Sequence, residues 1–320
     1  MATSKPLISI VVPLYNESAN LRALQAGLQK VYDAQHDYHF ETVYVNDGSR
    51  DDSLRVLDDI AKDYDAIRIV SLSRNFGKEV ATTAGLREAK GEAIMTLDAD
   101  GQHPVELIPE FLRRWQAGAK VVIGVRTANQ REGLIKRLGS KSFYRTINRL
   151  SRVHLVPGST DFRLIDRSVQ QEFNRMTERN RITRGLIDWL GYQRDYIEFV
   201  ANPRLEGEAG YSFRGLVKLY IDSIVSLSIS PLYIATYLGV VVLPVSVLLF
   251  IFMTLDKVTG DPLNLNLTGG AFVMVVMLFL IGVLLLSQGI IGLYLSHIHS
   301  ETQNRPLYVI DRAHSQGLSE

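Results

Sequence analysis

The first part of the chain alternates short apolar runs with stretches in which apolar residues recur at helical spacing. Leu7–Pro13 is a continuous apolar run, which is typical of a strand buried on both faces of a sheet. Further strands are expected at Glu41–Val45, Ile67–Leu72, Glu92–Leu97 and Lys120–Val125. Helical spacing is clear in the residues between the first two runs, such as Leu21, Leu24, Leu28 and Val31. This alternation predicts an α/β domain with a doubly wound, mostly parallel sheet.

Two much longer apolar runs, Pro231–Leu255 and Ala271–Leu295, follow near the C-terminus. Neither contains Asp, Glu, Lys or Arg, and each exceeds the roughly 20 residues that a helix needs to cross a bilayer core. Uncharged runs of this length favour a hairpin of two transmembrane helices over helices buried in a soluble core. Cations flank the hairpin at Arg204, Arg214, Lys218, Arg305 and Arg312, which predicts that both termini lie in the cytoplasm.

Residues Phe213 to Val225 join the α/β domain to the first long run and repeat apolar side chains at i, i+3, i+4 and i+7. Cations lie beside this apolar stripe, which favours a helix in the headgroup plane over one packed on the domain. The sequence therefore predicts four parts: a cytoplasmic catalytic domain (1–211), an amphipathic helix (212–229), two transmembrane helices (230–296, at about 231–255 and 271–295) and a cytoplasmic C-terminal tail (297–320).

Composition narrows the functions that the chain can have. The 320 residues carry a formal net charge of +1, which argues against broad nucleic-acid binding. There are no cysteines, so disulfides, thiolate zinc sites and cysteine nucleophiles are excluded. The N-terminus lacks the pattern of a signal peptide. The sequence leaves the oligomeric state open, with a homo-oligomer among the options.

A pair of aspartates follows the predicted strand at Glu92–Leu97, in the sequence Asp98-Ala99-Asp100-Gly101-Gln102. Hard divalent cations take oxygen ligands, and Mg²⁺ typically bridges one or two carboxylates to substrate phosphates. A sugar–diphosphate donor needs such a metal, because negative charge develops on its leaving group. The pattern therefore predicts a Mg²⁺ or Mn²⁺ site, although a pair of this kind is also common in capped turns.

Other polar residues also follow strands, and ligands bind at the carboxyl ends of strands in doubly wound sheets. Asp47 could accept a hydrogen bond from the imide of uracil, or could simply cap a turn. Pro13, Tyr15 and Glu17 could line the base and ribose pocket, with Tyr15 as a core aromatic in the alternative interpretation.

A cationic run and one further carboxylate complete the candidate chemistry. Arg126, Lys136 and Arg137 could bind an acceptor phosphate, since guanidinium groups match phosphate geometry; a solvated helix face is the alternative. Asp161 lies in a predicted turn, Gly158 to Arg163, and is the best candidate base. A phosphate monoester has a second pKa near 6, so Asp161 could instead orient the acceptor or the metal. Dinucleotide, Walker A, zinc-protease and serine-hydrolase motifs are absent from the sequence.

Taken together, these motifs resemble the polyisoprenyl-phosphate glycosyltransferases of glycosyltransferase family 2, which include dolichyl-phosphate mannose synthase and bacterial bactoprenol glucosyltransferases. The resemblance covers nearly the whole chain and rests on Val12–Glu17, Asn46–Ser49, Ser73–Lys78, Asp98–Pro104, Gly124–Arg126, Asp161–Leu164 and Asn304–Tyr308. The long Ser73–Lys78 segment and the C-terminal tail look most like the bacterial glucosyltransferase branch.

The resemblance implies a GT-A fold and an inverting transfer of a sugar, glucose from UDP-glucose above all, to undecaprenyl phosphate at the bacterial inner membrane. Carried over by position, Asp47 and Asp98 hold the nucleoside, and Asp100 and Gln102 hold Mg²⁺ or Mn²⁺. Arg126, with Lys136, Arg137 or Ser140, binds the acceptor phosphate, and Asp161 is the base.

Two departures from the family pattern stand out. Asn46 replaces the commoner Asp of an Asp-Asp-Gly-Ser motif, which loosens the nucleoside assignment. The segment Glu206–Tyr211 lacks the Lys of a Gly-Glu-Ser-Lys-Tyr loop, and Arg204 could substitute for it. Three alternatives remain: a different donor such as GDP-mannose, a non-catalytic flippase or assembly factor, and a processive polysaccharide synthase. The last is disfavoured because the chain lacks a Gln-x-x-Arg-Trp segment.

Overall fold

The computed structural model describes residues 5–127, 156–179, 181–202 and 269–318, with scattered positions between 237 and 258. Its centre is a seven-stranded sheet in the order β3-β2-β1-β4-β6-β5-β7. The strands are β1 (Leu7–Leu14), β2 (His39–Asn46), β3 (Ile67–Ser71), β4 (Ala93–Thr96), β5 (Val121–Arg126), β6 (Ser159–Asp166) and β7 (Arg194–Phe199). The five strands expected from apolar runs are confirmed as β1 to β5.

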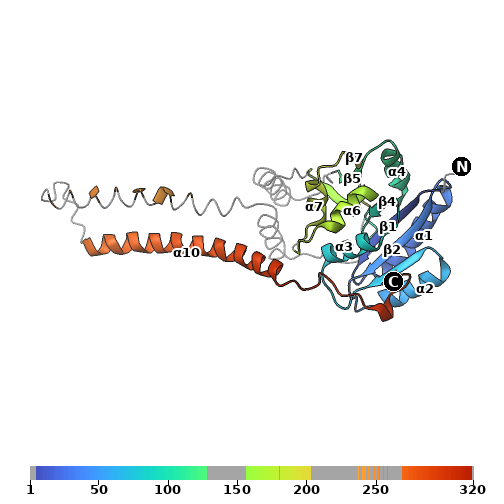
Figure 1. The fold of residues 1–320 in the computed structure, drawn as a ribbon, viewed down its shortest axis with the longest axis horizontal. Helices are drawn as coiled ribbons and strands as arrows, with labels where there is room; N and C mark the ends of the chain where they lie inside the picture. The colour runs from blue at the N-terminus through green and yellow to red at the C-terminus, as the bar shows by residue number, and fades with distance from the viewer. Residues whose placement is uncertain are drawn as a thin grey trace.

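Helices cover both faces of the sheet (Figure 1). One face packs against α1 (Ser18–Ala34), α2 (Ser53–Asp63) and α4 (Ile108–Gln116), which follows the short 3-10 helix η1 (Val105–Leu107). The other face packs against α3 (Lys78–Glu88), α6 (Arg167–Arg175) and α7 (Thr183–Trp189). Successive side chains of a strand point to opposite faces, so Ile10 joins the first core and Val11 the second.

The order of the strands places a topological switch point between β1 and β4. The chain runs outward from β1 through β2 to β3, then returns to pair β4 with the other side of β1. All of these pairs are parallel. Their carboxyl ends therefore meet at one edge, where doubly wound sheets bind ligands.

The sequence-based interpretation of Gly158 to Arg163 as a turn is wrong beyond its first residue. Residues Ser159–Asp166 form β6, which pairs antiparallel with both β4 and β5. Only Gly158 keeps a turn conformation, with φ of 79°. The polar composition of the strand's start concealed it, because Gly, Ser, Thr and Asp favour turns when no neighbouring strand is known. The predicted sheet is thus mostly parallel, as expected, with one antiparallel insertion.

The long helix α10 (Gly269–Thr302) extends away from the sheet (Figure 1). It contains the second predicted span, and its segment Phe279–Thr302 is long and apolar enough to cross a membrane, judged by length and composition. Among the described residues no other helix meets that test. The predicted amphipathic helix at 212–229 lies outside the described residues, and so does most of the first predicted span, whose described positions are helical.

The C-terminal tail returns from α10 to the α/β domain (Figure 1), where it lies along the outer strand β3. Isolated antiparallel bridges join Leu72 to Ile310 and Ile69 to Gln316. The backbone N–H of Ser73 donates to the carbonyl of Val309 at 2.9 Å. The tail thus pairs with an edge strand that would otherwise present open backbone groups, and it reaches the start of the Ser73–Lys78 segment.

Candidate active site

The carboxyl edge of the sheet brings Asp98 and Asp161 together through the register of β4 and β6. Thr96 pairs with Arg163 in this antiparallel ladder. Moving two residues onward from Thr96 and two residues back from Arg163 leads to Asp98 and Asp161, so the two lie at the same level. The Thr96 hydroxyl fixes this arrangement by donating to the backbone carbonyl of Asp161 at 2.5 Å. Because β6 runs antiparallel, its first residues lie at the carboxyl edge of the sheet, which we call the ligand edge.

Lys78, the first residue of α3, bridges these two aspartates. Its Nζ lies 2.6 Å from Asp98 Oδ1 and 2.8 Å from Asp161 Oδ2. The lysine side chain is 41% exposed, against 27% for Asp98 and 24% for Asp161, so the cluster is open to a ligand. Burial alone would lower the pKa of Lys78, but the charges of Asp161 and Asp98 outweigh burial and raise it. The Lys78 ammonium is therefore kept charged at the centre of the site.

Asp161 lies among cations. Burial would raise the pKa of its carboxyl, but the charges of Lys78 and Arg184 outweigh burial and hold the pKa well below its usual range. Glu79, next to Lys78, accepts a hydrogen bond from the Thr183 N–H at 2.7 Å and so ties α3 to α7. Burial, with the nearby charge of Asp161, raises the pKa of Glu79. Asp161 is thus an ionised carboxylate of low basicity.

Asp47 holds the loop that leads to Lys78. Its two carboxylate oxygens accept from the backbone N–H groups of Phe76 at 2.7 Å and Gly77 at 2.9 Å. Burial raises the pKa of the Asp47 carboxyl, and the two N–H donors oppose this rise. The next residue, Gly48, has φ of 65°, and a Cβ there would lie 2.5 Å from the Arg74 carbonyl carbon. Only glycine lets these two loops approach so closely.

Loops after β1 and β2 are joined by hydrogen bonds. The Asn16 side chain accepts from the Arg50 N–H at 2.8 Å, while the Asn16 N–H donates to the Ser49 hydroxyl at 3.0 Å. Pro13 is buried at the end of β1, and Glu17 is half-buried. Tyr15 is 39% exposed, so the alternative that it is a core aromatic is wrong. The predicted base and ribose residues therefore lie along the same edge as Asp47.

Asn46, which departs from the family pattern, has a structural role in this edge. Its side-chain amide donates to the Ser71 hydroxyl at 3.2 Å and its oxygen accepts from the Ser49 N–H at 3.0 Å. The residue thus connects β2 to β3 and closes the turn after β2.

The segment from Asp98 to His103 is a tight loop. The Asp98 N–H donates to Nδ1 of His103 at 3.0 Å, and Asp100 Oδ1 accepts from the Gln102 N–H at 3.1 Å. The His103 ring stacks on Phe162, with ring centroids 4.9 Å apart, and burial lowers the pKa of His103. This histidine was missed from the sequence; its position five residues after Asp98, behind a Gly-Gln turn, is the only signal.

The oxygen ligands of this loop suit a metal that is shared with a substrate. No three His, Cys, Asp or Glu side chains gather to hold a metal in the part of the chain that the structure describes. Mg²⁺ usually takes one or two protein carboxylates and completes its coordination with waters and substrate phosphates. The two carboxylates and the amide oxygen of Asp98, Asp100 and Gln102 therefore fit such an ion.

Arg126 is the one predicted acceptor-phosphate residue that the structure describes. It ends β5, is half-buried, and its N–H donates to the Gly158 carbonyl at 2.9 Å, close to the start of β6. Lys136, Arg137, Ser140 and Arg204 lie outside the described residues. Lys78 and Arg184 were given no role from the sequence. For Lys78, the available signal was a cation at the start of a helix, where positive charge is disfavoured.

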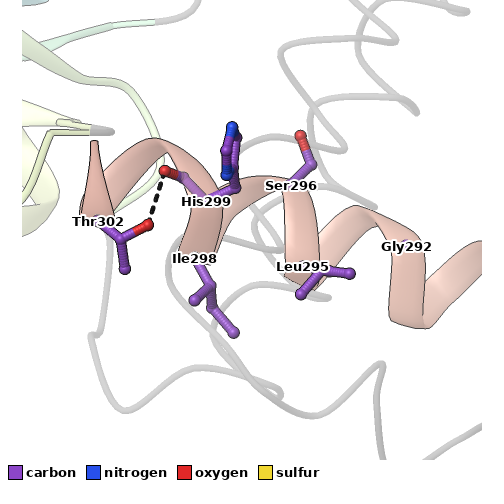
Figure 2. A pocket seen from close by; sticks show the side chains of 6 residues that line it. All are labelled: Gly292, Leu295, Ser296, Ile298, His299 and Thr302. Atoms are coloured by element: carbon purple, nitrogen blue, oxygen red, sulfur yellow. Dashed lines mark hydrogen bonds between the residues drawn. The ribbon is translucent and has the colours of Figure 1, made fainter.

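A separate apolar depression lies at the end of α10 nearest the sheet (Figure 2). It is lined by Gly292, Leu295, Ser296, Ile298, His299 and Thr302. The Thr302 hydroxyl donates to the His299 carbonyl at 3.0 Å, within the helix itself. Among the residues that the structure describes, its lining comes from α10, and none of these residues belongs to the Lys78 cluster.

Comparisons with known proteins agree with the resemblance. The model of glycosyl transferase family 2 matches residues 9–173. An uncharacterized glycosyltransferase of Synechocystis sp. is 39% identical over 303 residues, covering 95% of this chain and 94% of that protein. The SfII prophage-derived bactoprenol glucosyl transferase of Shigella flexneri is 34% identical over 308 residues, covering 96% of this chain and 98% of that protein.

Among solved structures, mannosyl-3-phosphoglycerate synthase from Rubrobacter xylanophilus aligns with a TM-score of 0.49 and 15% identity, over 68% of this chain and 71% of that chain. The family match and the full-length relatives show that the chain belongs to glycosyltransferase family 2. It is a glycosyltransferase, and its mostly parallel sheet is of the GT-A type.

Proposed function

We propose that this glycosyltransferase moves glucose from UDP-glucose to undecaprenyl phosphate, with inversion at the anomeric carbon, to give a lipid-linked monosaccharide. One observation carries the proposal: similarity to the bactoprenol glucosyl transferase of Shigella flexneri covers 96% of this chain. It therefore extends beyond the family match at 9–173 and takes in the C-terminal apolar runs. With a lipid acceptor, those runs would anchor the enzyme in the membrane that contains its substrate.

The proposed location is the bacterial inner membrane, with the catalytic domain and both termini in the cytoplasm. The helix α10 supports one span, and the uncharged run Pro231–Leu255 supports a second. The amphipathic helix at 212–229 would lie at the cytoplasmic surface and keep the sheet edge close to the lipid headgroups.

The donor would bind along the edge formed by β1, β2 and β4. Pro13, Tyr15, Glu17, Asp47 and Asp98 are the proposed nucleotide-sugar residues. Asp100 and Gln102 would hold Mg²⁺ or Mn²⁺, which when bound neutralises charge on the leaving diphosphate. Asp100 is 8% exposed, and an ion held there would complete its coordination with waters and the donor phosphates.

The acceptor phosphate would bind at Arg126 together with Lys136, Arg137, Ser140 and Arg204. One of its oxygens attacks the anomeric carbon of glucose, and the bond between that carbon and the diphosphate oxygen breaks, releasing UDP. Attack from the face opposite the leaving group inverts the anomeric centre.

Asp161 is the proposed catalytic carboxylate. It would either take a proton from monoanionic acceptor phosphate or orient the acceptor. The cations around it hold its pKa low, and a phosphate monoester is largely dianionic at pH 7. Both facts favour the orienting role.

The test is transfer by the full-length protein in detergent. Labelled UDP-glucose, undecaprenyl phosphate and Mg²⁺ should give a labelled lipid product together with UDP, and EDTA should abolish the reaction until Mg²⁺ or Mn²⁺ is restored. A parallel reaction with GDP-mannose tests the alternative donor. Formation of lipid product from GDP-mannose alone would reassign the donor, and absence of product with every sugar nucleotide would support the non-catalytic alternative.

The matched variants for this test are Asp100→Ala and Asp52→Ala. Asp100 lies in the proposed metal loop, whereas the Asp52 side chain is 67% exposed and pairs with Arg55 beside α2. Only Asp100→Ala should lose turnover, while both proteins should remain folded. Full activity of Asp100→Ala would remove this loop from the proposed metal site.

A further inference from the structure

The charge arrangement around Lys78 is unusual for the start of a helix. The positive end of the helix dipole makes the first turn unfavourable for a cation, yet Lys78 begins the 11-residue helix α3. Two carboxylates compensate for this, since Asp98 and Asp161 both lie within hydrogen-bond distance of its Nζ. Its two carboxylate partners, and not the stability of the helix, therefore account for a lysine at this position.

The backbone around Lys78 fixes its position from both sides. The N–H groups of Phe76 and Gly77 donate to Asp47, and Gly77 has φ of 99°, which turns the chain into α3. On the other side, Glu79 accepts from the Thr183 N–H. These contacts hold the Lys78 backbone in place while its side chain remains 41% exposed. The ammonium can thus exchange partners without any change of the fold.

We propose that Lys78 is the resident counter-cation of the site, a positioning residue that keeps Asp98 and Asp161 at a fixed separation and opposes binding of a divalent metal until the donor arrives. This inference rests on the proposed metal-assisted transfer. It goes beyond the proposed function in giving the order in which the metal ion and the donor diphosphate bind.

The structure places the competing charges close together. Asp98 lies two residues before Asp100 in the proposed metal loop, and Lys78 already neutralises part of the charge there. A divalent cation that enters alone must compete with this ammonium for the Asp98 carboxylate. A donor diphosphate brings new anionic oxygens, which can accept from the ammonium while the metal takes its place beside the carboxylates. Metal and donor therefore bind better together than either does alone.

Removing the ammonium should separate metal binding to the free protein from metal binding together with the donor. Charge-assisted hydrogen bonds typically contribute about 1.5–3 kcal/mol, which corresponds to roughly 10- to 100-fold in affinity. In Lys78→Met, Mn²⁺ should bind the free protein ~10-fold or more tightly than in wild type. Prior addition of UDP should then improve Mn²⁺ affinity less than it does in wild type. Turnover with Mg²⁺ should fall ~10-fold or more, chiefly in kcat, because Asp161 loses its partner.

The experiment measures Mn²⁺ binding by electron paramagnetic resonance on the full-length protein in detergent, with and without UDP, beside steady-state transfer. Lys78→Arg keeps the charge and should bind Mn²⁺ with the same affinity as wild type. Lys90→Met is the matched control, because Lys90 is exposed beyond the other end of α3, and it should resemble wild type in both measurements.

The outcomes distinguish this inference from the proposed function. Equal Mn²⁺ affinity of wild type and Lys78→Met without UDP, in folded proteins, overturns the counter-cation role even if transfer occurs. Tighter Mn²⁺ binding by Lys78→Met supports it, whichever donor the wild-type enzyme uses. Failure of wild type to transfer any sugar contradicts the proposed function but leaves the metal-binding comparison valid.

Discussion

The strand β6 carries an aspartate near each end, and the two differ in what holds them. Asp161 lies at the ligand edge of the sheet and Asp166 at the opposite edge, where it ends β6 and caps α6. Each pairs with a lysine: Lys78 Nζ lies 2.8 Å from Asp161 and Lys120 Nζ lies 3.0 Å from Asp166. The pKa is lowered for both carboxyls.

The physical causes of these lowered pKa values are different. For Asp166, burial is outweighed by hydrogen bonds, which lower its pKa to about 2. Its oxygens accept from the Ser168 N–H and hydroxyl, from Trp115 Nε1 at 2.8 Å and from Lys120. For Asp161, burial is outweighed mainly by the charges of Lys78 and Arg184.

A perturbed pKa therefore does not by itself mark an active site. The Asp166 carboxylate is surrounded by donors that belong to the fold, so a ligand would have to break several of them. The Asp161 carboxylate has an exchangeable lysine and neighbouring cations that suit an anionic substrate. Location at the carboxyl edge of the sheet, and not the pKa, separates the proposed catalytic carboxylate from the structural one.

The largest expected effect on stability lies between these two aspartates. Arg163, on the same strand, lies 3.5 Å from Asp188, and both side chains are 2% exposed. Asp188→Ala leaves the Arg163 charge buried without this partner, which typically costs about 3–5 kcal/mol. Denaturant unfolding of the full-length protein in detergent should show this loss. The double variant Arg163→Met/Asp188→Leu should recover much of it, and a loss under about 1 kcal/mol in Asp188→Ala would contradict the structural role.

The next effect concerns activity at the ligand edge. Asp161→Asn removes the charge but keeps the size, and transfer should fall with UDP-glucose affinity nearly unchanged; loss of a general base would lower transfer at least ~10²-fold at pH 7. If Asp161 takes a proton from monoanionic acceptor, the loss should be greatest at low pH. If it orients a dianionic acceptor, the loss should be smaller and should recover as the pH rises through about 6.

Rates and donor affinity, measured from pH 5 to 8, decide between these roles. Rates close to wild type would remove Asp161 from the mechanism. A collapse of donor affinity would instead assign it to the nucleotide or metal site.

The sequence predicted the regular half of this fold well and the inserted strand poorly. The strands β1 to β5 are rich in apolar residues, because both of their faces are largely buried. The start of β6 is Ser-Thr-Asp, and its pairing partners are distant in sequence, so local composition indicated a turn. Strand pairing of this kind depends on tertiary context, which a single sequence does not contain.

The candidate site shows the same division. Asp98 was proposed because carboxylates after strands suggest ligand binding, and Asp161 because it lies among turn residues beside an Arg. Nothing in the sequence shows that these residues, 63 positions apart, share one lysine. Asp47 was expected to face a nucleoside, and the structure adds a contact that holds the Phe76–Gly77 backbone. Such contacts follow from loop geometry, which residue types alone do not specify.

The smallest expected effect is at the structural end of β6. Because the pKa of Asp166 is about 2 in the folded protein, below about 3.9 for an unfolded chain, its ionised form favours folding. This contribution is present above pH 4 and is lost as the pH falls toward 2. Asp166→Asn keeps a good capping residue but loses the pairing with Lys120, so we expect a loss of about 1–2 kcal/mol in the free energy of unfolding at pH 7. Denaturant unfolding at several pH values should show wild type and variant converging below pH 4, with transfer activity at pH 7 unaffected. A stability difference that stays constant down to pH 3 would show that packing, and not charge, makes Asp166 important.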